Sequence, residues 1–181
     1  MAFAHGLTNM MYLGVDPGKS GGLALLRQDG SVATALAMPQ TERDLLDVVA
    51  DLDRFSDPTD SGPVHAALER VSASPQMGVV SAFTFGRGYG ALLMALTAAR
   101  IPFDLVSPRT WQPYMGVVYA GRAKQGGRDK NISKRRAQQC WPMMKITHAI
   151  ADALLLAEFC RRMHTTTSLR GQGVQVTRPQ Q

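Results

Sequence analysis

The chain has 181 residues, of which 45% are hydrophobic and 19% are charged, and its formal net charge is +6. This composition excludes a largely disordered chain and is sufficient for one domain with its own core. The basic excess favours a polyanionic partner such as nucleic acid. Cys140 and Cys160 suggest neither a metal-site spacing nor a disulfide framework, and no apolar run reaches the roughly 20 residues that span a bilayer, so we expect no membrane segment.

The first predicted element is a β-hairpin. Two short apolar runs, Met10–Val15 and Leu23–Leu26, flank the turn-forming sequence Asp16-Pro17-Gly18 and a second glycine cluster. A third strand, Val32–Met38, would complete an antiparallel meander. Asp16 would then end a strand beside small residues, with open space in front of its carboxylate. The simpler alternative is a turn residue, because Asp-Pro-Gly is common in turns.

A helix and a buried strand are expected next. Thr41 is a suitable N-cap for a helix over Glu42–Phe55, in which the apolar residues recur at helical spacing. The run Val64–Val71 has the length and apolar character of a central strand, and Glu69 stands near its end. A solvated carboxylate paired with Arg70 is the alternative interpretation of Glu69.

A long helical pattern covers Val79–Arg100, and a strand over Ile101–Val106 follows it. The sequence Gly86-Arg87-Gly88-Tyr89-Gly90 interrupts the helical pattern. Because each glycine weakens a helix by about 1 kcal/mol, we expect these glycines to permit close backbone packing or contact with a ligand. The glycines lack the Lys-Ser/Thr ending of a nucleotide-binding loop, so we reject that function.

The segment 109–136 is strongly basic and carries interleaved aromatic residues. Such a mixture suits phosphate contacts and base stacking, although a solvated charged face is the common alternative. We expect a helix over Asp129–Gln139. The residues predicted to bind DNA, here and in the glycine-rich stretch, are Arg87, Tyr89, Arg109, Trp111, Arg122, Lys124, Arg128, Lys130 and Lys134.

The last predicted element is a helix over Lys145–Arg162, rich in Ala and Leu. His148 and Asp152 are four residues apart and therefore share one face, which is otherwise apolar. Polar groups on such a face need a partner or a metal ion, and a His–Asp pair within the helix is the alternative. We expect a flexible leader over residues 1–10, a single domain over 11–163 and a disordered tail over 164–181.

Together these elements supply three carboxylates and one imidazole: Asp16, Glu69, Asp152 and His148. Oxygen and nitrogen donors of this kind hold hard divalent ions, either Mg²⁺ or Mn²⁺. Two such ions activate water and stabilise the leaving oxygen in phosphodiester hydrolysis. The sequence therefore predicts a metal-dependent nuclease site beside a basic surface.

Six stretches in this order resemble the RuvC-type Holliday junction resolvases of the RNase H-like superfamily. They are Gly14-Val15-Asp16-Pro17-Gly18-Lys19-Ser20-Gly21-Gly22, Leu68-Glu69-Arg70-Val71, 81–90, Val106-Ser107-Pro108-Arg109-Thr110-Trp111, Asp129-Lys130 and 151–157. The pattern is most similar to phage-like RuvC relatives and to the chloroplast resolvase of green plants and algae. The resemblance covers Tyr12 to about Arg162.

This resemblance implies an α/β RNase H-like fold with a five-stranded mixed sheet flanked by helices. It also implies a homodimer that nicks four-way junction DNA symmetrically with two Mg²⁺ or Mn²⁺ ions in each active site. Asp16 and Glu69 match the family's first two acids, and the C-terminal acidic pair falls on His148 and Asp152, where the histidine is a departure. Lys130 matches a basic position against the scissile phosphate. The implied location is the chloroplast nucleoid, or otherwise the cytoplasm or a phage-encoded setting.

Three alternatives stay open from the sequence. The first is a catalytically silent junction- or DNA-binding protein on the same fold, although clustered carboxylates do not help such a protein to bind phosphates. The second is an RNase H-like nuclease acting on RNA or hybrid duplexes. A sugar-kinase or actin-like ATPase is the third, but those folds need two such domains, and 181 residues are too few for them.

Overall fold

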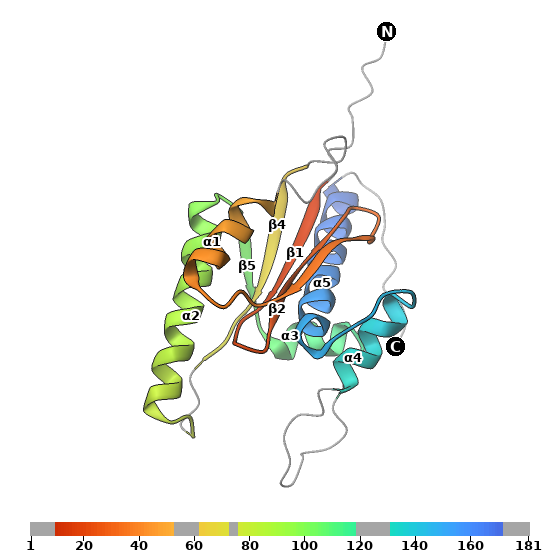
Figure 1. The fold of residues 1–181 in the computed structure, drawn as a ribbon. Helices are drawn as coiled ribbons and strands as arrows, with labels where there is room; N and C mark the ends of the chain where they lie inside the picture. The colour runs from red at the N-terminus through yellow and green to blue at the C-terminus, as the bar shows by residue number, and fades with distance from the viewer. Residues whose placement is uncertain (1–9, 53–61, 73–75, 119–130, 172–181) are drawn as a thin grey trace.

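The computed structural model describes residues 10–52, 62–72, 76–118 and 131–171, with side chains as far as Thr165. Within these residues five strands form one mixed sheet in the order β3-β2-β1-β4-β5 (Figure 1). Strands β1, β2 and β3 form the expected antiparallel meander, whereas β4 and β5 run parallel to β1. The strands are β1 (Met11–Asp16), β2 (Gly22–Leu26), β3 (Val32–Ala37), β4 (Val64–Glu69) and β5 (Phe103–Val106). The predicted five-stranded mixed sheet is confirmed.

Helices cover both faces of this sheet. Helices α1 (Glu42–Ala50) and α2 (Val79–Ala98) lie on one face, and α5 (His148–Gly171) runs along the other (Figure 1). The two short helices α3 (Pro108–Tyr114) and α4 (Asn131–Cys140) contact α5. The sequence did not predict α3, whose N-cap is Ser107, with Oγ accepting a hydrogen bond from the amide of Arg109 at 3.3 Å.

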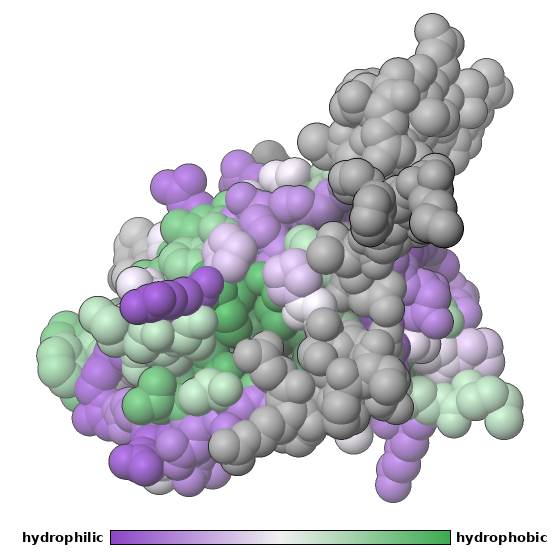
Figure 2. All heavy atoms as spheres, turned by 90° about the horizontal axis from the view of Figure 1, so that it is seen from above, coloured by the Kyte–Doolittle hydropathy of each residue, from purple (hydrophilic) through white to green (hydrophobic). Residues whose placement is uncertain are grey.

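Alternation along the central strands divides the core into two layers. In β1, Leu13 and Val15 face the α1/α2 layer, so Gly14 and Asp16 face α5. In β4, Leu68 likewise faces the α1/α2 layer, and Glu69 faces α5. Seen from above, strongly apolar side chains are visible in a hollow near the centre of the molecule, with polar side chains on part of its rim (Figure 2).

Two glycines allow the backbone of α5 to lie directly on the sheet. A Cβ at Gly14 would collide with the carbonyl oxygen of Ala153, and a Cβ at Gly22 would lie 2.6 Å from the carbonyl oxygen of Ala149. Gly22 is the register partner of Asp16. The first turn of α5 is therefore fixed against the end of β1 that carries Asp16.

Helix α2 departs from the sequence predictions in two respects. It is continuous through its glycines, and a Cβ built at Gly86, Gly88 or Gly90 meets nothing within 4 Å, so close packing is not their reason. At 20 residues the helix is also long and apolar enough to cross a membrane by length and composition, which corrects our statement that no run has this length. Leu92 and Leu96 instead bury one side of α2 in the core.

The C-terminal helix is longer than the sequence indicated. Helix α5 continues to Gly171, so residues 164–171 of the predicted tail are helical in backbone. The extension has a physical reason, because Met163 packs against the core and His164 bonds to Asp104 on β5. The predicted leader, apart from residue 10, and residues 172–181 lie outside the described part of the chain.

Candidate metal-binding active site

Asp16 and Glu69 are brought together by the parallel pairing of β1 and β4. Val15 is the register partner of Leu68, so the next residue on each strand places Asp16 beside Glu69. Both side chains face α5, and adjacent strands are about 4.8 Å apart. Two carboxylates that are 53 positions apart in sequence thus become neighbours at the carboxyl ends of two strands.

Glu69 is buried, with 6% of its surface exposed, and it is oriented by Trp111. The indole Nε1 of Trp111 donates a hydrogen bond to Oε1 of Glu69 at 3.1 Å. A buried carboxylate requires such a donor, because burial without one is costly. Trp111 itself is 0% exposed, so its ring cannot stack on a base. The burial of Trp111 contradicts the prediction that it contacts DNA, and its indole contacts Glu69 instead.

The turn after β1 packs closely against Asp16 and depends on glycines to do so. Gly18 adopts φ +122°, which favours glycine, and its carbonyl accepts from the amide of Gly21 at 3.1 Å. A Cβ at Gly21 would collide with the backbone carbonyl of Asp16 and would lie 3.0 Å from its Cγ. Asp16 is half-buried. The turn geometry and the candidate ligand role of Asp16 are therefore compatible.

Asp152 lies in the second turn of α5, next to Ala153, whose backbone abuts Gly14 of β1. Its Oδ1 is buried and accepts no hydrogen bond within the described residues. An unsatisfied buried carboxylate oxygen is costly unless a cation or another donor approaches it. This orphaned oxygen, together with the oxygen-rich donor set, fits a hard divalent ion.

His148 begins α5 at the same end of the sheet, but its side chain is exposed. Among the described residues, Asp16, Glu69, His148 and Asp152 do not form a group whose ligand atoms all lie within 4.8 Å of one another. The strands and α5 therefore bring these residues to one end of the sheet, but the four side chains are not close enough together to form such a group. Nothing in the described structure shows His148 acting as a ligand, and that role stays a prediction.

The predicted DNA-binding residues lie in different environments. Arg122, Lys124, Arg128 and the catalytic candidate Lys130 lie outside the described residues. Arg109 is exposed on α3, and Lys134 is half-buried on α4. Arg87 extends from α2 to Glu42 of α1, with Nη2 2.7 Å from Oε1. Tyr89 is half-buried, and burial raises the pKa of its hydroxyl, although Arg70 has the opposite effect.

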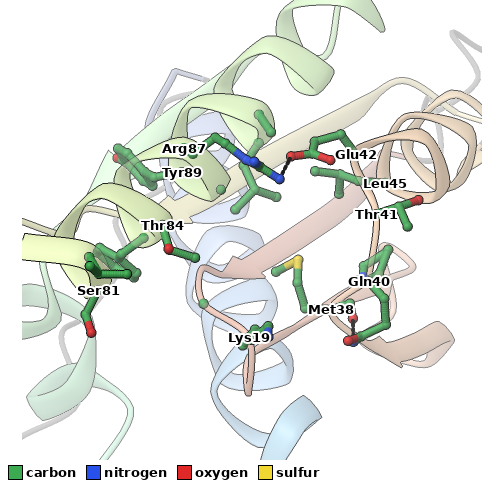
Figure 3. A pocket seen from close by; sticks show the side chains of 17 residues that line it. Lys19, Met38, Gln40, Thr41, Glu42, Leu45, Ser81, Thr84, Arg87 and Tyr89 are labelled. Carbon is green, nitrogen blue, oxygen red and sulfur yellow. Dashed lines mark hydrogen bonds and ion pairs between the residues drawn. The ribbon is translucent and has the colours of Figure 1, made fainter.

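A cleft of about 420 Å³ lies between α2, the β1–β2 turn and the β3–α1 connection (Figure 3). The ion pair of Arg87 with Glu42 and the side chain of Lys19 lie on its wall. Gly18 and Lys19 belong both to this cleft and to the turn that follows Asp16. Lys19 was not among the predicted DNA-binding residues, although its position three residues after Asp16 was a usable signal.

No protein-family model matches the chain, and no curated protein matches its sequence. Solved structures do match. RuvC of T. thermophilus, solved in complex with a Holliday junction substrate, superposes with a TM-score of 0.54 at 21% identity, over 86% of this chain and 97% of that chain.

The fold is that of RuvC. A second T. thermophilus RuvC structure matches with a TM-score of 0.53 at 18% identity, over 86% of this chain and 98% of that chain. The yeast mitochondrial Holliday junction resolvase Ydc2 gives 0.47 at 13% identity, over 89% and 80% of the two chains. The resemblance to RuvC inferred from the motifs is thus confirmed for the fold, whereas the closeness to chloroplast and phage-like relatives stays a prediction.

Within the RuvC fold of this chain, the candidate site has a definite location. It lies at the carboxyl ends of the parallel strands β1 and β4, beneath the first two turns of α5. Three carboxylates from these three elements share that end with one exposed imidazole. Such a set of donors is suited to holding divalent cations against a phosphodiester.

Proposed function

We propose that this protein is a structure-selective endonuclease that resolves four-way DNA junctions by paired, symmetric nicks. The observation that carries the proposal is the pairing of Asp16 with Glu69 at the end of β1 and β4, with the unpartnered Oδ1 of Asp152 on the helix that packs there. A buried carboxylate oxygen without a partner, such as Oδ1 of Asp152, is costly, and such a cost is often found at functional sites.

The metal ions would be held by Asp16, Glu69 and Asp152, with His148 as a further candidate ligand. When bound, two Mg²⁺ or Mn²⁺ ions supply an activated water and stabilise the leaving oxygen of the phosphodiester. The contribution of the chain is to fix the carboxylates. Trp111 holds Glu69 through its indole N–H, and Gly21 leaves room beside Asp16.

Junction DNA as the substrate is supported by charge as well as by fold. The net charge is +6, and Arg109 and Lys19 are exposed around the site. T. thermophilus RuvC, with the same fold, was solved with a Holliday junction substrate. Lys130 and the basic residues around it would contribute further phosphate contacts. We therefore expect junction affinity to decrease steeply with salt, because each phosphate contact releases a condensed cation.

Two symmetric nicks require two active sites, and hence a homodimer. Helix α2 carries exposed apolar side chains, with 86% of Val79, 79% of Val80 and 73% of Phe83 accessible to solvent. Exposed large apolar residues in one patch are typical of association surfaces. This patch supports self-association through α2, which sedimentation of the purified protein would test.

The decisive experiment is cleavage of a synthetic four-way junction, titrated with Mg²⁺ and Mn²⁺. The wild-type protein should nick two opposing strands at symmetric positions, whereas Asp16→Asn and Glu69→Gln should bind the junction without cutting it. Asp47→Asn, on the exposed face of α1, is the matched control and should cleave normally. Absence of cleavage with either ion would contradict the proposal.

The same assay separates the other candidate functions. Junction binding without cleavage under all metal conditions would favour a silent DNA-binding protein. Faster cleavage of an RNA–DNA hybrid than of the junction would favour an RNase H-like nuclease. The chloroplast nucleoid, with the cytoplasm or a phage-infected cell as alternatives, is proposed as the location from the resemblance alone, and a fluorescent fusion of the full-length protein would test it.

A further inference from the structure

A second group of potential metal ligands lies on the α5 face of the sheet, away from the nuclease carboxylates. The side chains of His65, Cys160 and His164 each offer one ligand atom, and these atoms all lie within 4.8 Å of one another. Cys160 is eight residues beyond Asp152 on α5, a separation of about 12 Å at 1.5 Å per residue. The two groups of ligands are therefore separate sites.

The fold brings these three residues together by ordinary periodicity. Cys160 and His164 are four apart on α5 and so lie on one side of the helix. His65 alternates with the α1/α2-facing residues Val64 and Ala66, so it points to α5. The thiol of Cys160 is 3.8 Å from the carbonyl oxygen of His65, which shows how closely helix and strand approach here.

Asp104 on β5 contacts both imidazoles, although it is not in the group whose ligand atoms all lie within 4.8 Å of one another. Its Oδ2 lies 3.0 Å from Nε2 of His65 and 3.3 Å from Nε2 of His164, and the two imidazole rings have centroids 3.9 Å apart. Because both imidazoles contact the same carboxylate oxygen, small movements would allow them to bind one cation together. The carboxylate would then either complete the coordination or bond to a ligating histidine, as carboxylates do at zinc sites.

The environment of the group is suited to a bound ion. Cys160 is buried, and His65 and His164 are partly covered, with 16% and 33% of their side chains exposed. A cavity of about 480 Å³ is lined by Asp104, Cys160 and His164, which provides a route of entry from solvent. Arg70 also lines this cavity.

We propose that His65, Cys160 and His164 bind one Zn²⁺ ion, with Asp104 either completing the coordination or bonded to a ligating histidine. A thiolate with two imidazoles selects a borderline-soft ion such as Zn²⁺ over Mg²⁺ or Ca²⁺, and tetrahedral coordination is typical of zinc. The ion would join β4 and β5 to the C-terminal half of α5. It would thereby stabilise the helical extension beyond residue 163 without taking part in phosphodiester cleavage.

The first test uses Co²⁺ as a spectroscopic substitute in chelator-treated, reduced wild-type protein. One equivalent should give intense tetrahedral d–d bands and a thiolate-to-metal charge-transfer band, and one equivalent of Zn²⁺ should remove both. Cys160→Ser should eliminate the charge-transfer band, whereas Cys140→Ser, the matched control at the other cysteine, should keep it. No band with wild type, or a band that survives Cys160→Ser, would overturn the proposal.

The second test measures thermal unfolding with and without Zn²⁺. A saturating ion should raise the Tm of the wild-type chain by about 5 °C or more, and His164→Gln should remove most of that rise. His164 is on the partly exposed side of the site, so this variant is useful even if Cys160→Ser folds poorly. Asp152→Asn should retain the full rise, because it belongs to the nuclease site. An unchanged rise in His164→Gln would refute the assignment, whatever the outcome of the cleavage assay.

Discussion

The indole nitrogen of Trp111 lies 3.1 Å from Oε1 of Glu69, and both residues are buried. This bond joins the short helix α3 to the end of strand β4. The aromatic and basic composition of the segment indicated that Trp111 stacks on DNA bases. The structure instead shows Trp111 bonded to a candidate metal ligand. Since the bond spans 42 sequence positions, only the fold could reveal it.

Replacing Trp111 by phenylalanine would keep most of the ring volume and remove the N–H donor. We expect Trp111→Phe to lose about 2 kcal/mol of unfolding free energy, because a buried charged acceptor loses its partner. Cleavage should also decrease, since Glu69 is no longer held. Urea unfolding and junction cleavage measure the two effects. Trp141→Phe is the control: it removes a bond to the carbonyl of Gly30 and should leave cleavage unchanged.

Asp152→Asn tests whether the unpartnered Oδ1 of Asp152 binds a cation. In the presence of a chelator the variant should be as stable as the wild type, or more stable by about 1 kcal/mol, because the charge on a carboxylate with one buried, unpartnered oxygen is removed. Mn²⁺ should raise the Tm of the wild type and raise that of the variant much less. Equal Mn²⁺ responses in wild type and variant would remove Asp152 from the ligand set.

Two glycine-to-alanine substitutions, one on α2 and one on β1, should change stability in opposite directions. Gly88→Ala should stabilise the protein by about 1 kcal/mol, because alanine is the better helix former and its Cβ meets nothing within 4 Å. Gly14→Ala should strongly destabilise it, since the new Cβ collides with Ala153 on α5. Thermal unfolding checks both changes. If Gly88→Ala also weakens junction binding, a ligand approaches this helix closely.

The buried Glu158 predicts a defined dependence of stability on pH. Burial acts to raise the pKa of its carboxyl, but hydrogen bonds from Arg161 and Arg162 outweigh burial and hold the pKa below its usual value of 4.5. The stabilisation is therefore present above pH 4.5 and is lost as the pH falls through the lowered pKa.

Glu158→Gln should accordingly be less stable than the wild type at pH 7 by about 2 kcal/mol, and the difference should shrink as the pH falls below 4.5. Urea unfolding across this range measures it. Glu42→Gln, which breaks the exposed ion pair with Arg87, should change stability little at any pH. A constant difference for Glu158→Gln over the whole range would contradict the assigned cause.

The sequence by itself determined the meander, the strand that carries Glu69 and the apolar face of α5. These features depend on local periodicity and turn chemistry, which is why Thr41 caps α1 as expected, with Oγ1 accepting from the amide of Asp44 at 3.1 Å. The ordered acidic residues Asp16, Glu69 and Asp152 could also be selected from sequence, because each interrupts or ends an apolar run.

Only the tertiary structure decided which residues meet. Parallel register placed Asp16 beside Glu69, and the collapse of α5 onto Gly14 and Gly22 fixed the end at which Asp152 lies. Burial converted Trp111 from a surface residue into the partner of Glu69. Cys160 and His164 are four residues apart on α5, but no sequence spacing shows that His65 on β4 joins them. Contacts between distant segments depend on packing of the whole chain, and local patterns carry no information about them.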